Sequence, residues 1–177
     1  RGIQNGEIVK EHTFVESISR CVDPYKNFED YMALADNPDF RFVVSNTTEA
    51  GIVYDETDDF NALPPKTYPG KLTKFMYERF KHFNGASDKG LVLIPCELIE
   101  NNGGNLKKCV MQFANLWNLG EGFISWVEKD CIFCSTLVDR IVTGYPREEA
   151  DAICEKLGYK DNLVDTAELF ALWVIES

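Results

Sequence analysis

The sequence predicts an α/β fold built around a parallel sheet, and three segments carry this prediction. Residues 40–45 (FRFVVS) and 91–95 (LVLIP) are short apolar runs, the pattern of strands buried on both faces. Between them, Pro69 begins a segment whose apolar residues recur at helical spacing as far as Phe83. A strand, a helix and a second strand in this order favour a βαβ unit, so we expect the two strands to be parallel neighbours.

Further short elements are expected on either side of this unit. Asn5-Gly6 lies between two extended runs and indicates a two-residue hairpin. Residues 49–68 contain several acids and two prolines, so we expect a loop whose carboxylates are solvated. The chain after this unit is expected to be mostly helical, and Asp165 is a candidate cap for a last helix that reaches the chain end. Other helices are expected after Asn27 and within residues 106–117, 123–127 and 147–157.

Composition and charge exclude two classes of partner. The 177 residues, 45% of them hydrophobic, are enough for one full-sized domain. Eighteen basic and 29 acidic residues give a net charge of −11, which repels nucleic-acid phosphates and anionic lipids. No apolar stretch approaches the ~20 residues of a transmembrane helix, and no signal peptide opens the sequence. We therefore expect a cytoplasmic protein without nucleic-acid or membrane partners, and nothing in the composition specifies an oligomeric state.

The six cysteines are spread through apolar stretches, and Cys131 and Cys134 form the one close pair. A structural zinc site would need a second pair or histidines at ligand spacing, but His12 and His82 are far away in the sequence. A redox Cys-x-x-Cys pair normally follows a strand and opens a helix. We expect reduced, structural cysteines and no bound metal.

Polar residues follow both predicted parallel strands. The first strand runs into Ser45 and then residues 46–49 (NTTE), and the second continues into residues 95–104 (PCELIENNGG). Open parallel sheets bind ligands beyond the carboxyl ends of their strands. Hydroxyls and amides there suit a sugar or nucleotide, and carboxylates suit proton transfer. The same residue types also cap turns, so a site and a purely structural role are both open from position alone.

Asp139 and Arg140 lie within an apolar run, TLVDRIV at residues 136–142. Charges in such a run normally need partners, so this pair indicates either a site or an ion pair within the fold. The sequence contains no GxGxxG loop, no P-loop and no serine nucleophile elbow. Residues 102–105 (NGGN) at a predicted helix start are only a weak signal for anion binding.

Four strings taken together resemble one known family: VSNTTEAGI (44–52), YPGKLTKFMYERFKHFNGASDKG (68–90), IPCELIENNG (94–103) and FCSTLVDRIVTGYPREE (133–149). They are similar to the mannitol dehydrogenase-like, polyol-specific long-chain dehydrogenases. The resemblance implies a Rossmann-type domain, followed by a mostly helical domain, in an NAD-dependent, metal-independent oxidoreductase. It favours the branch that interconverts the sugar acids D-tagaturonate and D-altronate in hexuronate catabolism.

The resemblance also implies roles for the end of the first strand. Glu49 matches the acid of a Thr-x-Thr-Glu element and is expected to relay the proton of a catalytic lysine, which must be neutral to act as a base. Asn46, Thr47 and Thr48 are expected to lie at the NAD cleft.

Substrate-binding roles are implied for three further residues. Asp139 matches an aspartate that faces the substrate pocket and is expected to be both a catalytic and a substrate-binding residue. In the turn after the second strand, Glu97 and Asn102 are expected to bind substrate. Leu98 stands where the polyol enzymes have an Asn that polarises the substrate oxygen, which argues for a branch that handles its substrate differently.

The resemblance further implies that residues 1–135 are the later part of the Rossmann-type domain and residues 136–177 the start of the helical domain. The glycine-rich dinucleotide loop is then expected before Arg1 and the catalytic lysine after Ser177. Because the sequence also stops in an apolar segment, we expect a middle piece of a longer enzyme that is inactive alone. The alternatives are a fructuronate or mannitol-type reductase and a non-catalytic module that binds a sugar acid.

Overall fold

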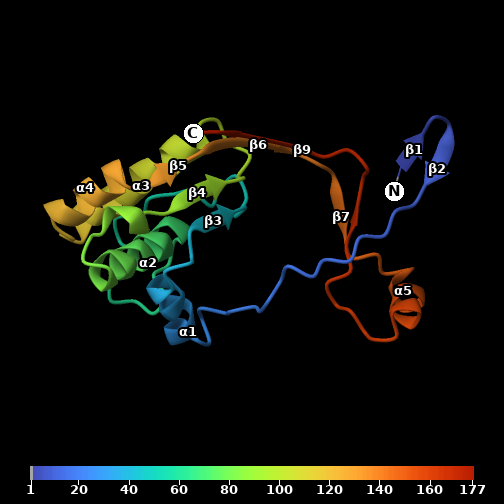
Figure 1. The fold of residues 1–177 in the computed structure, drawn as a ribbon, viewed down its shortest axis with the longest axis horizontal. Helices are drawn as coiled ribbons and strands as arrows, with labels where there is room; N and C mark the ends of the chain where they lie inside the picture. The colour runs from blue at the N-terminus through green and yellow to red at the C-terminus, as the bar shows by residue number, and fades with distance from the viewer. Residues whose placement is uncertain (1) are drawn as a thin grey trace. The chain divides into compact units, whose positions relative to one another are not determined.

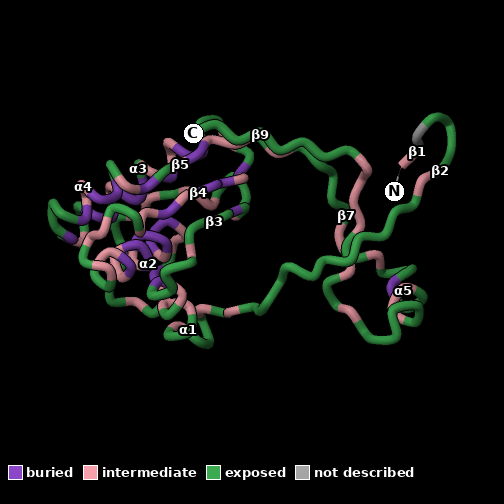
Figure 2. Tube along the Cα trace, in the orientation of Figure 1, coloured by how far each residue is buried: buried purple, intermediate pink, exposed green. Residues whose placement is uncertain are grey.

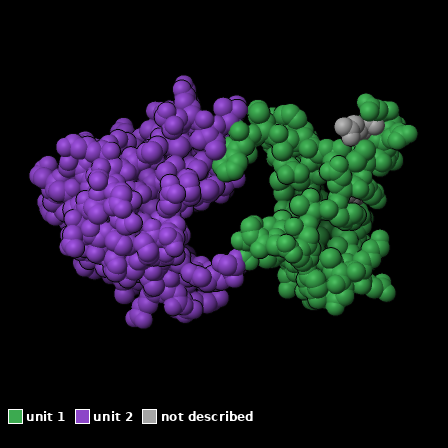
Figure 3. Space-filling view, viewed as in Figure 1, with its two compact units in different colours: residues 1–18, 138–173 green, residues 19–137, 174–177 purple. Residues whose placement is uncertain are grey.

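The structure is a computed structural model that describes residues 2–177, and Arg1 lies outside the described residues. The described residues form two compact units (Figure 3). The first, called the sheet unit here, comprises residues 19–137 and 174–177. The second, called the ribbon unit, comprises residues 2–18 and 138–173 of the described chain.

The sheet unit is built on three parallel strands in the order β3-β4-β5 (Figure 1). They are β3 (Phe42–Ser45), β4 (Val92–Pro95) and β5 (Ile132–Phe133). Helix α2 (Tyr68–His82) and the short 3₁₀ turn η2 (Ser87–Lys89) connect β3 to β4. The predicted βαβ unit with parallel, adjacent strands is therefore confirmed.

Helices cover one face of this sheet, while on the other face the residues of β3 are exposed. In the strand register, Val43 pairs with Leu93 and Leu93 with Phe133, and these three residues belong to or pack against the hydrophobic core. The alternate residues Phe42 and Val44 are more than half exposed. The prediction that the first strand is buried on both faces is thus wrong, because alternate side chains of a strand point to opposite faces and only one face of β3 is covered.

The core lies between the sheet and helices α2, α3 (Asn102–Leu116) and α4 (Glu121–Lys129), where the buried positions gather in Figure 2. Thr67 caps α2 by accepting a hydrogen bond from the Gly70 N–H at 3.0 Å. Helix α1 (Phe28–Ala33) and the turn η1 (Leu34–Asp36) follow Asn27 as predicted, although the Asn27 side chain makes no capping hydrogen bond. Among residues 2–177, no helix combines the length and apolar character needed to cross a membrane.

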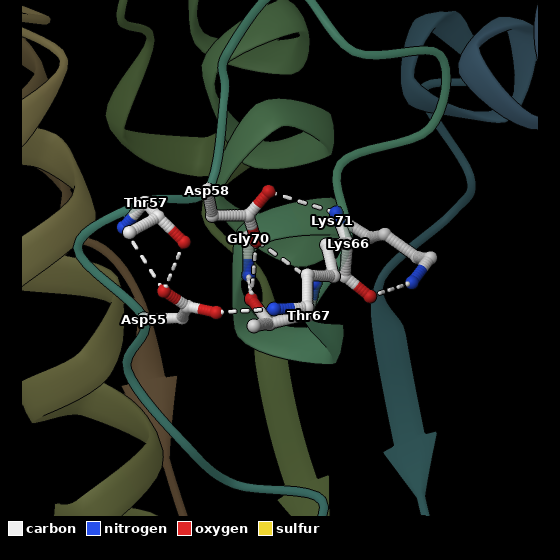
Figure 4. Close-up of polar contacts among 7 residues, drawn as sticks. All are labelled: Asp55, Thr57, Asp58, Lys66, Thr67, Gly70 and Lys71. Carbon is white, nitrogen blue, oxygen red and sulfur yellow. Dashed lines mark hydrogen bonds and ion pairs between the residues drawn. The ribbon is translucent and has the colours of Figure 1, made fainter.

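The loop between β3 and α2 is organised around a buried acid (Figure 4). Asp58 is 5% exposed, and its carboxylate accepts hydrogen bonds from the Lys66 N–H, the Thr67 N–H and the Thr67 hydroxyl at 2.7–2.8 Å. Asp55 accepts a hydrogen bond from Lys66 at 2.6 Å, and this bond, with two more from Thr57, lowers the pKa of Asp55. The expectation of solvated carboxylates is therefore wrong for Asp58, whose donors lie eight and nine residues further along the chain.

The ribbon unit contains short antiparallel pairs and one helix. Strands β1 (Gly2–Gln4) and β2 (Glu7–Val9) form the predicted hairpin, with positive φ at both Asn5 and Gly6. Strand β7 (Val142–Gly144) pairs with β8 (Thr166–Ala167). Helix α5 (Ala150–Leu157) ends at Gly158, which has the left-handed φ of 78° that suits glycine.

The predicted last helix after Asp165 is wrong. Residues Leu172–Glu176 form strand β9, which is hydrogen-bonded to β6 (Ser135–Asp139). Four of the five β9 residues are apolar and all five are exposed, so the run has no buried helical face. The β-branched and aromatic residues of LWVIE suit a strand, and the partner strand lies more than 30 residues earlier in the sequence, beyond the reach of a local pattern. The chain after the βαβ unit is accordingly less helical than expected.

All six cysteines are free thiols. Cys131 and Cys134 flank the two residues of β5 and are buried, so the pair does not open a helix. Burial raises the pKa of the Cys131 thiol to about 11, which keeps it protonated and unreactive at neutral pH. The structure thus places this pair in the core of the sheet unit.

Candidate functional site at the carboxyl edge of the sheet

Glu97 joins the ends of β3 and β4. The residue is 1% exposed and lies two positions beyond the last residue of β4. One carboxylate oxygen accepts a hydrogen bond from the Ser45 hydroxyl at 3.0 Å. The other accepts two, from the Thr47 N–H at 3.0 Å and the Thr47 hydroxyl at 2.8 Å. The polar residues that follow the two parallel strands therefore meet at one edge, as the sequence predicted.

Asn102 ties the same edge to β6. Its amide nitrogen lies 3.0–3.1 Å from three main-chain oxygens, those of Pro95, Glu97 and Thr136. Its amide oxygen accepts hydrogen bonds from the N–H groups of Gly103 and Thr136, both at 2.9 Å. Asn102 is 1% exposed, so all of these groups are satisfied without water.

Two backbone features allow this close arrangement. Asn101, at the start of α3, has a left-handed φ of 50°, which asparagine tolerates better than most residues. A Cβ atom at Gly103 would overlap the main-chain oxygen of Cys134, so only glycine lets the first turn of α3 approach the chain there. Gly103 and the two asparagines of the segment NNGG are therefore explained by packing.

The turn after β3 presents the remaining candidate residues to solvent. Asn46, Thr48 and Glu49 are exposed, and their side chains form no hydrogen bond or ion pair with residues 2–177. The turn closes through a hydrogen bond from the Gly51 N–H to the Thr48 main-chain oxygen at 3.1 Å. The edge therefore has a buried layer, which holds the strands together, and an exposed layer available to a ligand.

Tyr68 places an unsatisfied hydroxyl beside the buried layer. Its oxygen is buried and has no hydrogen-bond partner among the described residues. Burial raises the pKa of Tyr68 well above its usual value, while the nearby Ser45 side chain opposes this shift and the negative charge of Glu97 adds a smaller increase. The phenol is therefore held in its protonated form at the first residue of α2.

Replacing Tyr68 with phenylalanine is expected to keep or raise the stability at neutral pH, by up to ~1 kcal/mol, because the lost hydroxyl has no partner. The folded state holds the Tyr68 proton above pH ~10, where the unfolded state releases it. Stability due to this group is thus lost as the pH rises above ~10, and Tyr68→Phe should decline less steeply there.

Thermal unfolding midpoints measured at a series of alkaline pH values check this prediction. Tyr25→Phe is the control, because Tyr25 is 71% exposed. A loss of stability in Tyr68→Phe at neutral pH would show that the hydroxyl has a partner in solution.

Asp139 and Arg140 are both exposed, so the charges are not buried as their apolar neighbours suggested. The guanidinium of Arg140 donates to the main-chain oxygen of Glu168 at 3.1 and 3.3 Å, and the Ile141 N–H donates to the Glu168 carboxylate at 2.6 Å. Asp139 and Arg140 form no ion pair with each other, and the side chain of Asp139 has no polar partner among the described residues. The ion-pair alternative is therefore wrong.

The structure brings together some of the site residues predicted from the sequence. Thr47, Glu97 and Asn102 belong to one network at the sheet edge, whereas Asp139 lies in the ribbon unit. No role was predicted for Tyr68 or for Thr136, whose hydroxyl also donates to the Pro95 oxygen. The position of Ser45 at the end of a strand was a usable signal that it belongs to the site. Thr136 had no such signal, because its partner Asn102 lies 34 residues earlier in the sequence.

A three-stranded parallel sheet packed under helices, with its polar residues gathered at the carboxyl edge, defines an α/β domain of the Rossmann type. The family described as "Mannitol dehydrogenase Rossmann domain" matches residues 3–177, and the chain belongs to this family. The family resemblance read from the sequence is therefore confirmed.

Curated relatives agree with this assignment. The chain is 50% identical over 177 residues to an altronate oxidoreductase of Yersinia enterocolitica, covering 99% of this chain and 37% of that protein. It is 51% identical to proteins of the same name from Bacteroides thetaiotaomicron and Bacillus subtilis, covering 100% and 99% of this chain and 37% of each protein. The chain thus spans little more than a third of the length of these relatives.

Two solved structures have the same fold. The mannitol 2-dehydrogenase of Pseudomonas fluorescens, in a ternary complex with NAD and D-mannitol, matches with a TM-score of 0.70 at 20% identity, over 92% of this chain and 34% of that chain. A substrate-free D-sorbitol dehydrogenase matches with a TM-score of 0.66 at 22% identity, over 85% of this chain and 33% of that chain. At such identities the likeness concerns the fold alone.

Proposed function

We propose that this chain is part of a cytoplasmic NAD-dependent oxidoreductase that reduces D-tagaturonate to D-altronate and catalyses the reverse reaction in hexuronate catabolism. The observation that carries the proposal is the 50–51% identity to altronate oxidoreductases from three genera over almost the whole chain. The geometry supports it, because the exposed polar residues lie at the edge of the sheet where Rossmann-type domains bind their ligands.

Asn46 and Thr48 fit a role in holding NAD. Their side chains are exposed at the carboxyl edge of β3 and have no polar partner among the described residues. An amide and a hydroxyl can each donate and accept hydrogen bonds, which suits the ribose and carboxamide groups of this cofactor. When bound, NADH supplies the hydride. Thr47 differs from its neighbours because its N–H and hydroxyl already donate to Glu97.

The carboxylates have separate proposed roles. Glu49 is exposed and unpaired within residues 2–177, so it is able to accept a proton from a basic group and pass it to solvent. Asp139 is proposed to bind the hydroxyl groups of the sugar acid. Leu98 is 64% exposed at the position where the polyol enzymes have an Asn, so this turn offers an apolar surface in place of a hydrogen-bonding one.

Assays of the full-length protein that contains these residues test the proposal. Oxidation of NADH is followed with D-tagaturonate, D-fructuronate and D-fructose at equal concentrations. We expect kcat/KM for D-tagaturonate to exceed the other two by about tenfold or more. A preference for D-fructuronate or D-fructose would assign a different substrate, and binding of a sugar acid without turnover would support the non-catalytic module.

A further inference from the structure

The turn after β3 is held by a single buried carboxylate. Glu97 is 1% exposed, so its side chain cannot touch a substrate without leaving its present position. Its hydrogen bonds from Ser45 and Thr47 reach back to the end of β3 instead. We propose that Glu97 is a positioning residue that fixes the turn of residues 46–51 for cofactor binding, an inference that rests on the proposed function.

The hydrogen bonds to Glu97 set the direction of the side chains around it. Ser45 and Thr47 are two residues apart, and both hydroxyls turn inward to the same carboxylate. In extended backbone the residue between them points the opposite way, and Asn46 is exposed. By holding Ser45 and Thr47, Glu97 therefore directs Asn46 outward, to the side on which a ligand is expected.

The far end of the turn depends on the same hydroxyl. A Cβ atom at Gly51 would overlap the Thr47 hydroxyl oxygen, so Gly51 packs directly on the group that Glu97 holds. Thr48 between them has a φ of 72°, a conformation that β-branched residues seldom adopt unless their surroundings impose it. Loss of Glu97 should therefore release Thr48 and Glu49 as well as Asn46.

Glutamine at position 97 separates geometry from charge. Its amide oxygen can accept both bonds from Thr47, and its NH₂ group can donate to Ser45, because a hydroxyl also accepts. Glu97→Gln therefore keeps the hydrogen-bond geometry and removes the charge. Glu97→Ala removes both.

The experiment compares these two variants with the wild type in the full-length protein. The first readout is hydrogen exchange of the Thr47 amide without ligands, and the second is the Kd of NADH by fluorescence titration. In Glu97→Ala we expect the exchange rate and the Kd each to rise about tenfold or more, because a preorganised site is lost. KM for the keto acid should change less than about threefold, and Glu97→Gln should restore both readouts to near wild type.

Three results would overturn the proposal. An unchanged exchange rate of the Thr47 amide and an unchanged NADH affinity in Glu97→Ala would show that the turn of residues 46–51 keeps its conformation without Glu97. Equal damage in Glu97→Gln and Glu97→Ala would show that the charge acts, and a rise confined to the keto-acid KM would make Glu97 a substrate ligand.

Thr47→Val provides the same test where Glu97→Ala fails to fold, because it keeps the N–H bond and removes only the hydroxyl bond. Thr47→Ser, which keeps both donors, is its control. We expect weaker NADH binding in Thr47→Val only, and equal binding in the two variants would overturn the proposal. A wild type that does not reduce D-tagaturonate would refute the proposed function, while the exchange and NADH measurements still test the role of Glu97.

Discussion

Replacing Asp139 with alanine in the full-length protein is expected to lower kcat/KM for D-tagaturonate by about a hundredfold or more. The reason is that the Asp139 carboxylate, which is proposed to bind the substrate and so position its reacting carbon, is lost. The structure explains why this loss should be specific to activity. The Asp139 side chain is exposed and has no polar partner among residues 2–177, so its removal breaks no contact of the fold.

The backbone around Asp139 is held independently of its side chain. Arg140 donates to the main-chain oxygen of Glu168 and the Ile141 N–H donates to the Glu168 carboxylate, and neither bond involves the Asp139 side chain. The thermal unfolding midpoint of Asp139→Ala should therefore equal that of the wild type. Asp151→Ala is the control, since Asp151 is an exposed acid on α5 of the same unit. Unchanged kinetics in Asp139→Ala would show that Asp139 is only a surface charge.

The sheet could be predicted from the sequence because its signals are local. The run LVLIP ends at Pro95 as a strand should, and α2 begins within one residue of the predicted Pro69. The exposure of Phe42 and Val44 could not be predicted in the same way. Their composition suits a buried strand, but burial depends on whether other elements cover that face, which a short run of residues does not encode.

The errors have a common physical origin in long-range partners. Nothing in the local sequence distinguishes Asp58 from the other acids of its loop, because its donors, the N–H groups of Lys66 and Thr67, lie eight and nine residues further along the chain. The segment LWVIE has enough apolar residues for a helix, but it forms a strand because it pairs with β6.

The exposed candidate residues at the site were found because the carboxyl edge of a parallel sheet is a general place for ligands. The buried layer beneath them, which includes Thr136, depends on contacts across 34 or more residues.

Asn102→Asp is expected to be the most destabilising of the substitutions considered. The Asn102 nitrogen lies against three main-chain oxygens in a site that is 1% exposed. Aspartate has the same shape but replaces the donor with a second acceptor, so one carboxylate oxygen faces three carbonyl oxygens without a proton between them. We expect a loss of ~3–5 kcal/mol, the usual cost of an uncompensated buried charge.

The control for this substitution lies one turn further along α3. Asn105 also donates from its side chain, but only to the Glu100 oxygen at an exposed position. Asn105→Asp places a negative charge in the first turn of α3, where the helix dipole favours it, so the change should stay within ~0.5 kcal/mol. Thermal unfolding midpoints of the two variants in the full-length protein measure the difference. Because the Asn102 network joins the ends of β4 and β6, equal midpoints would mean that this edge is held by packing rather than by the hydrogen bonds of one amide.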